Sequence, residues 1–283
     1  MTGTPRFSVT IPAYNAESTL AETVDSVRAQ TFTDWELVIV DDGSTDSTLA
    51  LAESFAAKDP RIRVVSQENR GSGGAYNTAV RNTRSDLIVM LSADDLLLPE
   101  HLEKFDAFIA ENPDAAIFSS GGYYDYDDGV RELCGLHKQW ADPSTCATPD
   151  LLRACFFNMG AVYRKEIFDA VGGFREDIFA EDYLFFVLAF AKGYRHVYLD
   201  VPLAIHRRMS GQKSANAILV RQSELRTIRE VMATGLLSPS DYKAAQAAAR
   251  QRSFNIFVRK VLGIFLGPAG TTRLINRIRR RHP

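Results

Sequence analysis

The sequence of 283 residues contains only three cysteines and no C-x-x-C pair; the three are Cys134, Cys146 and Cys155. An odd, scattered set gives little support to a disulfide framework or a cysteine-ligated zinc site, and a reducing compartment is expected. No apolar run approaches the ~20 residues that span a bilayer. The first residues also lack the basic-then-apolar layout of a secretory leader. We therefore expect a cytoplasmic protein without a membrane-spanning segment.

Two common nucleotide-binding motifs are also missing from the glycine-rich stretch ENRGSGGAYN at residues 68–77. Tyr76 stands where G-x-G-x-x-G needs its last glycine, and no Lys-Ser/Thr pair follows as in a P-loop. A dehydrogenase and a P-loop hydrolase are therefore disfavoured. Two interpretations of the glycines stay open. The bare backbone approaches a phosphate or ribose at a helix N-terminus, or the stretch is a flexible turn before a helix.

The composition is that of a soluble globular protein with an ample core, since 46% of residues are hydrophobic and 24% are charged. The length suggests one large domain, or a main domain with an appendage. The net charge of −2 conceals an asymmetry: residues 251–283 carry +8 and the remainder carries −10. An acidic body without a basic groove argues against nucleic acid as a partner.

The first hundred residues alternate between the periods of strands and helices. Runs rich in Val and Ile predict buried strands, and these lie at 7–12, 35–40, 62–66 and 86–91. Apolar residues at helical spacing predict the intervening helices, at 17–30, 47–58 and 75–82. Strand–helix–strand units repeated in this way predict an α/β fold with a mostly parallel, doubly wound, Rossmann-like sheet.

The pattern loosens after Leu98, which suggests a division into about 1–98, about 99–215 and a helical extension at 216–283. We expect a helix at 99–112, a strand at 115–120 and an irregular acidic loop at 123–129. A strand then runs into a short helix closed by Gly172 and Gly173. A buried helix follows at 181–194, and a strand or strand pair broken by Pro202 follows at 196–207. Beyond residue 217 only helical patterns remain.

Acidic pairs follow two of the predicted strands. Asp41 and Asp42 come after the second strand, and Asp94 and Asp95 come after the fourth. Doubly wound sheets bind ligands at the carboxyl ends of their strands, so we expect both pairs at neighbouring strand ends of one crevice. Like charges at ~4 Å cost about 4 kcal/mol at an effective dielectric of ~20, so a cation or donor groups must offset them. Alternatively, each pair caps a helix in solvent.

Several motifs in order resemble the family-2 glycosyltransferases of the GT-A fold, over about residues 6–215. They are VTIPAYNAESTLAETVDSVRAQTFTDWELVIVDDGSTDST, ENRGSGGAYN, LSADDLLLP, GGFRED and FAEDYLFFVLAFAKGY. The resemblance implies an inverting enzyme that moves a sugar from a nucleotide-diphospho-sugar, most often UDP-linked. The acceptor would be a hydroxyl of a glycan or lipid-linked saccharide, as in polysaccharide biosynthesis. A divalent cation, Mg²⁺ or Mn²⁺, would bridge the diphosphate.

The resemblance also implies roles for individual residues. Asp182 aligns with the family's general base, with Glu181 beside it, although both acids also suit a helix N-terminus. The implied metal ligands are Asp94, Asp95 and His206, and a surface position is the alternative for His206. Asp42 is preferred over Asp41 as the acceptor of a hydrogen bond from the pyrimidine or ribose. The implied nucleotide-binding residues are Pro12, Tyr14, Glu17, Asp41, Asp42, Asn69, Gly71, Ser92, Ala93 and Asp94.

Three positions depart from the family pattern. Ser92 stands where the aspartate triplet usually begins, Tyr76 replaces a common Arg, and Ala204 replaces an Arg often found before the His. Arg70, Arg207 or Arg208 would have to supply the missing positive charge. The departures leave open a non-catalytic relative that binds a sugar nucleotide or glycan. A sugar-nucleotide pyrophosphorylase is disfavoured, because no glycine-rich loop with Lys or Arg follows the first strand.

The acceptor side and the C-terminal segment are less informative. Trp140, Asn158 and Met159, with the neighbouring Phe156 and Phe157, suit a sugar platform or simply belong to the core. The apolar stripe of the C-terminal segment comprises Phe254, Phe257, Val258, Val261, Leu262 and Phe265, flanked by basic residues. It suits a helix lying peripherally on an anionic inner membrane surface, or a helix packed on the acidic body.

Overall fold

The structure is a computed structural model that describes residues 3–127, 129–134, 152, 160–208 and 217–281. Its strands are β1 (Phe7–Ala13), β2 (Trp35–Asp41), β3 (Ile62–Ser66), β4 (Leu87–Met90), β5 (Leu96–Leu97), β6 (Ile117–Tyr126), β7 (Arg131–Cys134), β8 (Val162–Arg164) and β9 (His196–Arg208). Its helices are α1 (Leu20–Arg28), α2 (Thr48–Ala56), α3 (Gly71–Arg81), α4 (His101–Glu111), α6 (Glu166–Val171), α7 (Glu181–Ala191), α8 (Ala217–Ala233) and α9 (Pro239–Arg281).

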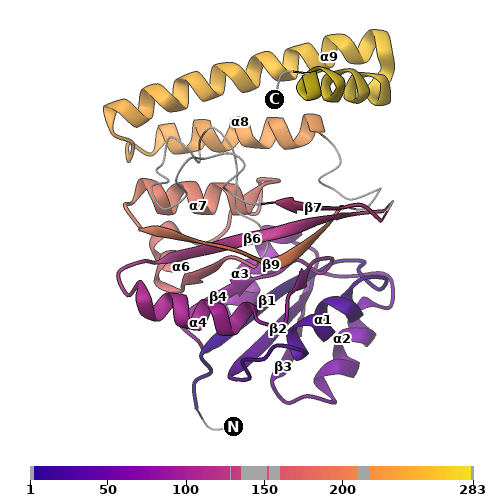
Figure 1. The fold of residues 1–283 in the computed structure, drawn as a ribbon, viewed down its shortest axis with the longest axis vertical. Helices are drawn as coiled ribbons and strands as arrows, with labels where there is room; N and C mark the ends of the chain where they lie inside the picture. The colour runs from indigo at the N-terminus through magenta and orange to yellow at the C-terminus, as the bar shows by residue number, and fades with distance from the viewer. Residues whose placement is uncertain (1–2, 128, 135–151, 153–159, 209–216, 282–283) are drawn as a thin grey trace.

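Within the described residues, one sheet of nine strands forms the centre of the fold (Figure 1). Its order is β3-β2-β1-β4-β8-β6-β9-β5, and β7 pairs with β6. Strands β1 to β4 are parallel, as are β6 and β9, whereas β5, β7 and β8 join in antiparallel fashion. The predicted α/β class with helices on both faces is confirmed, and the four predicted strands of the first half are all present.

The sheet order corrects one detail of the prediction. Strands β2 and β4, which carry the two acidic pairs, are not neighbours, because β1 lies between them and pairs with both. The chain crosses from β1 to β2 on one side and later returns to β4 on the other side. This reversal makes a topological switch point, the place in an open α/β sheet where ligands bind beyond the carboxyl ends of the strands. The two acidic pairs therefore flank β1 instead of touching.

Alternate side chains of the strands pack on opposite faces of the sheet, in separate hydrophobic clusters. On β4, Ile88 and Met90 pack with helices α3, α6 and α7, while Val89 and Leu91, just beyond the strand, pack with α1 and α4 on the opposite face. This alternation follows from the pleat, which sends successive side chains to opposite faces. Both faces are buried, which explains why the first four strands are nearly continuous apolar runs.

Two elements differ from the predicted boundaries. Helix α3 begins at Gly71, four residues before the predicted start, so the glycine-rich stretch lies inside the helix. The acidic stretch at 123–129 was expected to be an irregular loop, but β6 extends through it to Tyr126 between β7 and β9. Pairing on both edges thus overrides the weak strand pattern of its sequence.

Strand β9 accommodates Pro202 through an irregular register. Its pairing with β6 shifts on both sides of Gly121, so the proline lies at a bulge. A Cβ on Gly121 would come within 3.3 Å of the Val201 carbonyl oxygen. The bulge lets the strand continue past the proline and deliver residues 206–208 to the end of the sheet.

The C-terminal helices α8 and α9 lie against each other and stack on α7, away from β1 to β3 (Figure 1). Arg252 of α9 is 4% exposed, and its Nε lies 3.3 Å from Glu224 of α8. Ile256 is buried in the same face, whereas Phe254 and Phe257 are each 64% exposed. One face of α9 therefore packs on the body and another faces solvent. Of the helices described, none combines the length and the apolar character needed to cross a membrane.

Candidate functional site

The loops after β1 and β2 are tied together by Asn15. Its backbone is in the left-handed region, with φ of 48°. Its N–H donates to Ser44 Oγ at 3.0 Å, and its Oδ1 accepts from the Thr45 N–H at 2.9 Å. Glu17 accepts a hydrogen bond from the Ser47 N–H at 3.0 Å. This arrangement leaves Tyr14 51% exposed at the strand ends, with its ring accessible.

Asp41 and Asp42 are both buried at the end of β2, but their carboxylates are used differently. Asp42 Oδ1 accepts hydrogen bonds from Gln67 Nε2 at 2.7 Å and from the Arg70 N–H at 2.9 Å. Asp41 Oδ2 has only long contacts of 3.4 Å, to Ser44 and Ser66. Asp41 Oδ1 is buried and has no hydrogen-bond partner among the described residues. Asp41 Oδ1 thus has unused accepting capacity at a buried position.

Gly73 of α3 allows a close approach of backbone that neither interpretation of the glycine-rich stretch included. A Cβ on Gly73 would lie 2.5 Å from the Arg175 carbonyl oxygen. Next to it, the Asn77 side chain donates to the Phe174 carbonyl and accepts from the Phe174 N–H, both at 2.8 Å. The missing side chain at 73 therefore lets the segment before α7 pack directly on α3. Asn69 and Gly71, proposed as nucleotide contacts, lie at the start of this helix.

Asp95, after β4, is fully buried, and both of its oxygens are occupied by residues of β9. Oδ2 lies 2.9 Å from His206 Nδ1, and Oδ1 accepts from the Arg207 N–H at 3.0 Å. Two of the three predicted metal ligands therefore contact each other. A carboxylate bound to one ring nitrogen of a histidine fixes the orientation of the other nitrogen. Asp94 is half-buried on the neighbouring position.

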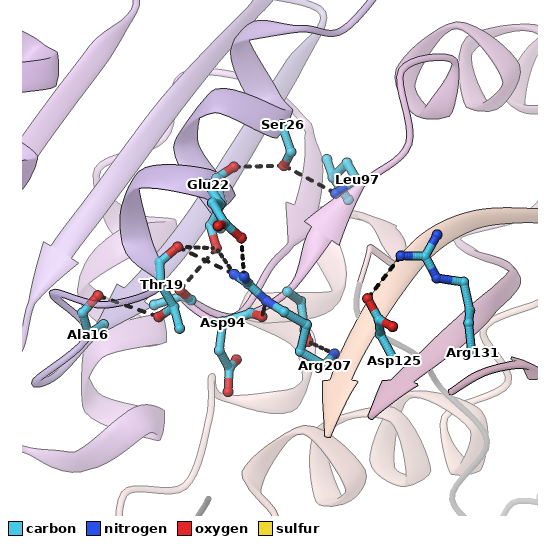
Figure 2. Close-up of polar contacts among 12 residues, drawn as sticks. Ala16, Thr19, Glu22, Ser26, Asp94, Leu97, Asp125, Arg131 and Arg207 are labelled. Carbon is cyan, nitrogen blue, oxygen red and sulfur yellow. Dashed lines mark hydrogen bonds and ion pairs between the residues drawn. The ribbon is translucent and has the colours of Figure 1, made fainter. Parts of the chain in front are cut away.

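Arg207 holds the turn that carries Asp94 and Asp95 (Figure 2). Its guanidinium reaches across to α1, where it bonds Glu22 and lies 3.3 Å from both the Thr19 carbonyl oxygen and Thr23 Oγ1. Its Nε also donates to the Asp94 carbonyl oxygen. In Figure 2 the carboxylate of Asp94 points away from Arg207.

The three arginines considered as replacements for the missing positive charge all have protein partners. Arg207 is engaged as above, Arg70 forms an ion pair with Glu176 at 2.5 Å, and Arg208 lies over the ring of Tyr124, 4.7 Å from its centroid. Each position therefore already contributes to the packing around the site. Release of any of them toward a diphosphate would cost these contacts.

Tyr76 links the end of β4 to the start of α7. Its hydroxyl is hydrogen-bonded to the side chain of Ser92. Burial raises the pKa of Tyr76 well above its ordinary value, and the carboxylates of Glu181, Asp182 and Asp95 raise it further. Carboxylates from the end of β4 and from the start of α7 thus act electrostatically on one hydroxyl.

Glu181 and Asp182 open helix α7. Glu181 is 7% exposed, while Asp182 is half-buried, with its Oδ1 accepting the Tyr183 N–H at 2.7 Å. An acid at a helix N-terminus is stabilised by the unpaired N–H groups and the helix dipole. Asp182 is thus an acid at a helix N-terminus, as one of the two interpretations predicted. This position is also compatible with a role as the general base.

The described residues contain no group of three His, Cys, Asp or Glu side chains placed to hold a metal ion. Asp94 and His206 are the predicted ligands with accessible atoms, since His206 is 25% exposed and Asp95 is fully buried. Mg²⁺ sites often use one or two carboxylates and complete their shell with water and substrate phosphates. The donor set fits a cation that is held jointly with a diphosphate.

The predicted acceptor residues Trp140, Asn158 and Met159 lie outside the described residues. A nearby aromatic residue that the sequence analysis did not single out is Tyr124, on β6. Its ring packs edge-on to His206, with centroids 5.6 Å apart. The alternation of tyrosine and aspartate over residues 124–127 is a short period-2 signal for a strand, with Tyr124 and Tyr126 on the same face.

Comparisons with known proteins agree on one family. A family model described as glycosyl transferase family 2 matches residues 8–174. Over 99 residues the chain is 46% identical to chondroitin synthase of Escherichia coli, covering 35% of this chain and 14% of that protein. Over 225 residues it is 29% identical to the uncharacterized glycosyltransferase EpsJ of Bacillus subtilis, covering 72% and 61% respectively. The chain thus spans less than two thirds of the length of either relative.

Solved structures share the fold. S. aureus TarS 1–349 in complex with UDP-GlcNAc superposes with a TM-score of 0.73 at 23% identity, covering 88% of this chain and 73% of that chain. The mannosyltransferase PcManGT from Pyrobaculum calidifontis, in complex with GDP-Man and Mn²⁺, gives 0.66 at 20% identity, covering 97% and 86%. This likeness confirms the fold that the sequence resemblance implies.

Proposed function

Because the chain belongs to glycosyl transferase family 2, we propose that it transfers a sugar from a UDP-linked donor to a hydroxyl of a glycan or lipid-linked saccharide, with inversion at the anomeric carbon. The observation that carries the proposal is that carboxylates from the end of β4 (Asp95) and the start of α7 (Glu181 and Asp182) all raise the pKa of the buried Tyr76 hydroxyl. Asp95 belongs to the candidate diphosphate-binding turn after β4, and Asp182 at the start of α7 is the candidate base. The UDP-GlcNAc complex of TarS supports the choice of donor.

The nucleotide would lie across the ends of β1 and β2. The exposed ring of Tyr14 offers a face for the base. Asp41 is the better candidate for the hydrogen bond from the pyrimidine or ribose, because its Oδ1 has no partner among the described residues while Asp42 Oδ1 already accepts two. An unsatisfied buried acceptor costs about 1–3 kcal/mol, which a donor group of the ligand would recover.

A divalent cation would be held by Asp94 and by His206, with Asp95 orienting the imidazole. Such an ion neutralises the charge that builds on the departing diphosphate. The Mn²⁺ complex of PcManGT supports this assignment. Arg207 donates to the Asp94 carbonyl oxygen and so holds the turn that carries this carboxylate before any ligand binds.

The acceptor hydroxyl would lose its proton to Asp182 as its oxygen attacks the anomeric carbon. The C–O bond to the acceptor forms while the bond to the diphosphate breaks, and the nucleoside diphosphate leaves with both bonding electrons. A positioned carboxylate that takes a proton in this way typically contributes about 10²–10⁴-fold. The contact between Asp182 and the Tyr183 N–H restrains the carboxylate at the start of α7.

Release of nucleoside diphosphate from a panel of UDP-, GDP- and dTDP-sugars, with Mn²⁺ or Mg²⁺, tests the proposal. Asp182→Asn keeps a side-chain oxygen that can accept the Tyr183 N–H, so donor binding and stability should persist while transfer falls by at least about 100-fold. Glu166→Gln, at the start of α6, is the matched control for a purely structural acid. Full turnover by Asp182→Asn would remove this residue from the mechanism.

The alternative is a non-catalytic protein that binds a sugar nucleotide. It predicts donor binding without release of nucleoside diphosphate for every donor and metal. In the catalytic case, Asp94→Ala abolishes the gain in donor affinity that Mn²⁺ produces. Equal donor affinity with and without metal in the parent chain contradicts the cation assignment.

We further propose that α9 attaches the protein peripherally to an anionic membrane surface on the cytoplasmic side. Phe254 and Phe257 project into solvent, with Arg250 and Lys260 exposed near them. Exposed aromatic and basic residues on one helix suit the interface of anionic lipids. Phe254→Ser with Phe257→Ser should reduce sedimentation with phosphatidylserine vesicles, while Tyr242→Ser on the same helix should not. Equal sedimentation of both variants contradicts the proposal.

A further inference from the structure

Helix α7, which carries the proposed base Asp182, begins at a residue that cannot cap it. The N-cap residue is Ala180, which makes no side-chain hydrogen bond. Alanine is a poor N-cap, because it has no side-chain oxygen to accept an N–H group of the first turn. The place at which α7 starts therefore depends on contacts that residues 175–180 make with other elements.

Helix α8 supplies one such contact through a buried hydroxyl. Ser223 is 6% exposed, and its Oγ accepts the Ala180 N–H at 2.9 Å. The carbonyl oxygen of Ala180 in turn accepts the Leu184 N–H at 3.3 Å, in the first turn of α7. The hydroxyl of α8 is thus bonded to the residue at which α7 begins, two positions before Asp182.

Two charged residues on the same face of α8 hold the segment before Ala180. Ser223, Arg226 and Glu230 are spaced by three and four residues, so they line one face of the helix. Arg226 donates to both the carbonyl oxygen and the carboxylate of Asp177. Arg175 lies 2.7 Å from the Asp177 carboxylate and 3.5 Å from that of Glu230, which lies 3.7 Å from Arg226. The four charges form a closed network, which restrains the segment more than an isolated surface pair would.

Helix α3 fixes the other side of the same segment. The Asn77 side chain bonds the backbone of Phe174, and Arg70 forms an ion pair with Glu176 at 2.5 Å. Residues 175–180 are therefore held between α3 and α8, with the start of α7 at their end.

Apolar packing keeps α8 in place against α7 (Figure 1). Ile228 and Val231 of α8 are fully buried, in the same hydrophobic cluster as Tyr183 and Phe185 of α7. The polar contacts of Ser223 and Arg226 are thus made by a helix that is itself anchored. The family model ends at residue 174, before all of these contacts of α8.

We infer that α8 positions the proposed base: Ser223, supported by Arg226 and Glu230, fixes the start of α7 and with it the place of the Asp182 carboxylate. The inference rests on the proposed function, in which Asp182 takes the proton of the acceptor hydroxyl. Ser223 and Arg226 are accordingly positioning residues, which act through residues 175–180. The helical extension is then a working part of the transfer site.

Ser223→Ala tests the inference through the kinetics of nucleoside diphosphate release. A misplacement of ~1 Å can cost about 100-fold, so loss of this hydrogen bond should lower kcat about 10-fold. The donor KM should not change, because the donor would lie across the ends of β1 and β2. Thr227→Val is the matched control, since Thr227 is fully buried one turn further along α8 and its hydroxyl has no hydrogen-bond partner among the described residues. Equal kcat in the two variants overturns the inference.

A double-mutant cycle separates positioning of the base from a general structural effect. In the Asp182→Asn background, Ser223→Ala should cause little further loss of kcat, because its effect in the parent passes through the Asp182 carboxylate. The same fold loss in both backgrounds contradicts this role of Ser223.

Arg226→Gln tests the charged part of the contact without emptying a buried site, since this side chain is 44% exposed. It should lower kcat about 5-fold, the limit for a surface ion pair worth about 1 kcal/mol. Arg229→Gln, at an exposed position of the same helix, is its control. If Ser223→Ala does not fold, this comparison decides, and equal kcat in the two arginine variants overturns the inference.

Hydrogen exchange distinguishes a failure of this inference from a failure of the proposed function. No release of nucleoside diphosphate by the parent from any donor rejects the proposed function. The Leu184 amide should still exchange about 10-fold faster in Ser223→Ala than in Thr227→Val, because its bond to the Ala180 carbonyl oxygen opens more often. Equal exchange in the two variants overturns the placement of α7 by α8, whatever the activity.

Discussion

His206 Nδ1 lies 2.9 Å from Asp95 Oδ2, across 111 residues of sequence. The carboxylate is fully buried, and its second oxygen accepts the Arg207 N–H. An aspartate in this position contacts the histidine and is shielded from solvent. Asp95 and His206 were both predicted to be metal ligands. Asp95 contacts the imidazole through Nδ1, and Nε2 is the ring nitrogen that takes no part in this contact.

Asp95→Asn should weaken the response to metal without abolishing donor binding. The loss of the charged partner of a metal-binding histidine typically costs about 10–100-fold in metal affinity. The measurement is the Mn²⁺ concentration that gives half-maximal nucleoside diphosphate release. Asp59→Asn is the control, since Asp59 is similarly buried but pairs with Arg61 away from the site. An unchanged Mn²⁺ dependence would show that Asp95 does not act through His206.

Arg207→Ala should lower transfer strongly, whereas Glu22→Ala should hardly affect it. The guanidinium of Arg207 is largely covered and fixes the Asp94 turn, and misplacement of a reacting group by ~1 Å can cost about 100-fold. Its partner Glu22 is 69% exposed, and such surface pairs contribute about 0–1 kcal/mol. Steady-state kinetics of the two variants make the comparison. Similar losses in both would mean that the ion pair, not the turn, matters.

Gly73→Ala should destabilise the protein by about 1–3 kcal/mol, the usual cost of inserting a methyl group into a packed contact. The added Cβ would lie 2.5 Å from the Arg175 carbonyl oxygen, so α3 or the segment before α7 must move. Urea unfolding measures the loss, and kcat reports the displaced acids. Ser72→Ala in the same turn is the control. Equal stability of the two variants would argue against the close approach.

The stability of the protein should fall between pH 6.5 and pH 4 because of His101. Burial lowers the pKa of this imidazole to about 4, despite hydrogen bonds with the backbone of Leu203 and Gly160. The unfolded chain binds the proton near pH 6.5 and the folded protein does not, so the contribution of the neutral ring is complete above 6.5 and declines as the pH falls to 4.

At pH 5 this effect of His101 amounts to about 2 kcal/mol relative to pH 7. Unfolding free energies of the parent and of His101→Gln at both pH values measure it. The parent should lose about 2 kcal/mol more than the variant on acidification. His196, whose pKa burial lowers to about 3, contributes to both proteins alike. The same pH dependence in parent and variant would exclude His101 as the cause.

The first half of the fold was predictable because its signals are local. Buried strands such as 35–40 are nearly continuous apolar runs, and helices such as 47–58 have apolar residues at helical spacing, so neighbours in sequence reveal each element. The extension of β6 to Tyr126 was indicated only by a short alternation of Tyr and Asp, which is a weak strand signal. Its residues are mixed in polarity, and pairing with β7 and β9 stabilises them as a strand. The start of α3 was misjudged because glycine normally disfavours helix interiors.

The candidate site was predictable as a set of residues but not as a set of contacts. The resemblance assigned Asp42 and Asp95 to ligands, yet Asp42 Oδ1 and both oxygens of Asp95 already contact protein groups. Asp41 has the unused oxygen. The hydrogen bonding of Asp41 differs from that of Asp42 because different residues after β3 and at the start of α3 contact them. No pattern in the local sequence predicts these contacts.

The amino-acid order by itself determined the strand–helix alternation, the acids after β2 and β4, and the acidic start of α7, because these depend on residues close together in the chain. The tertiary structure alone decided that β1 separates the two acidic pairs, that Gly73 admits the segment before α7, and that Tyr76 meets Ser92. These are meetings between distant segments, and they follow from the shared packing of all the elements on both faces of one sheet.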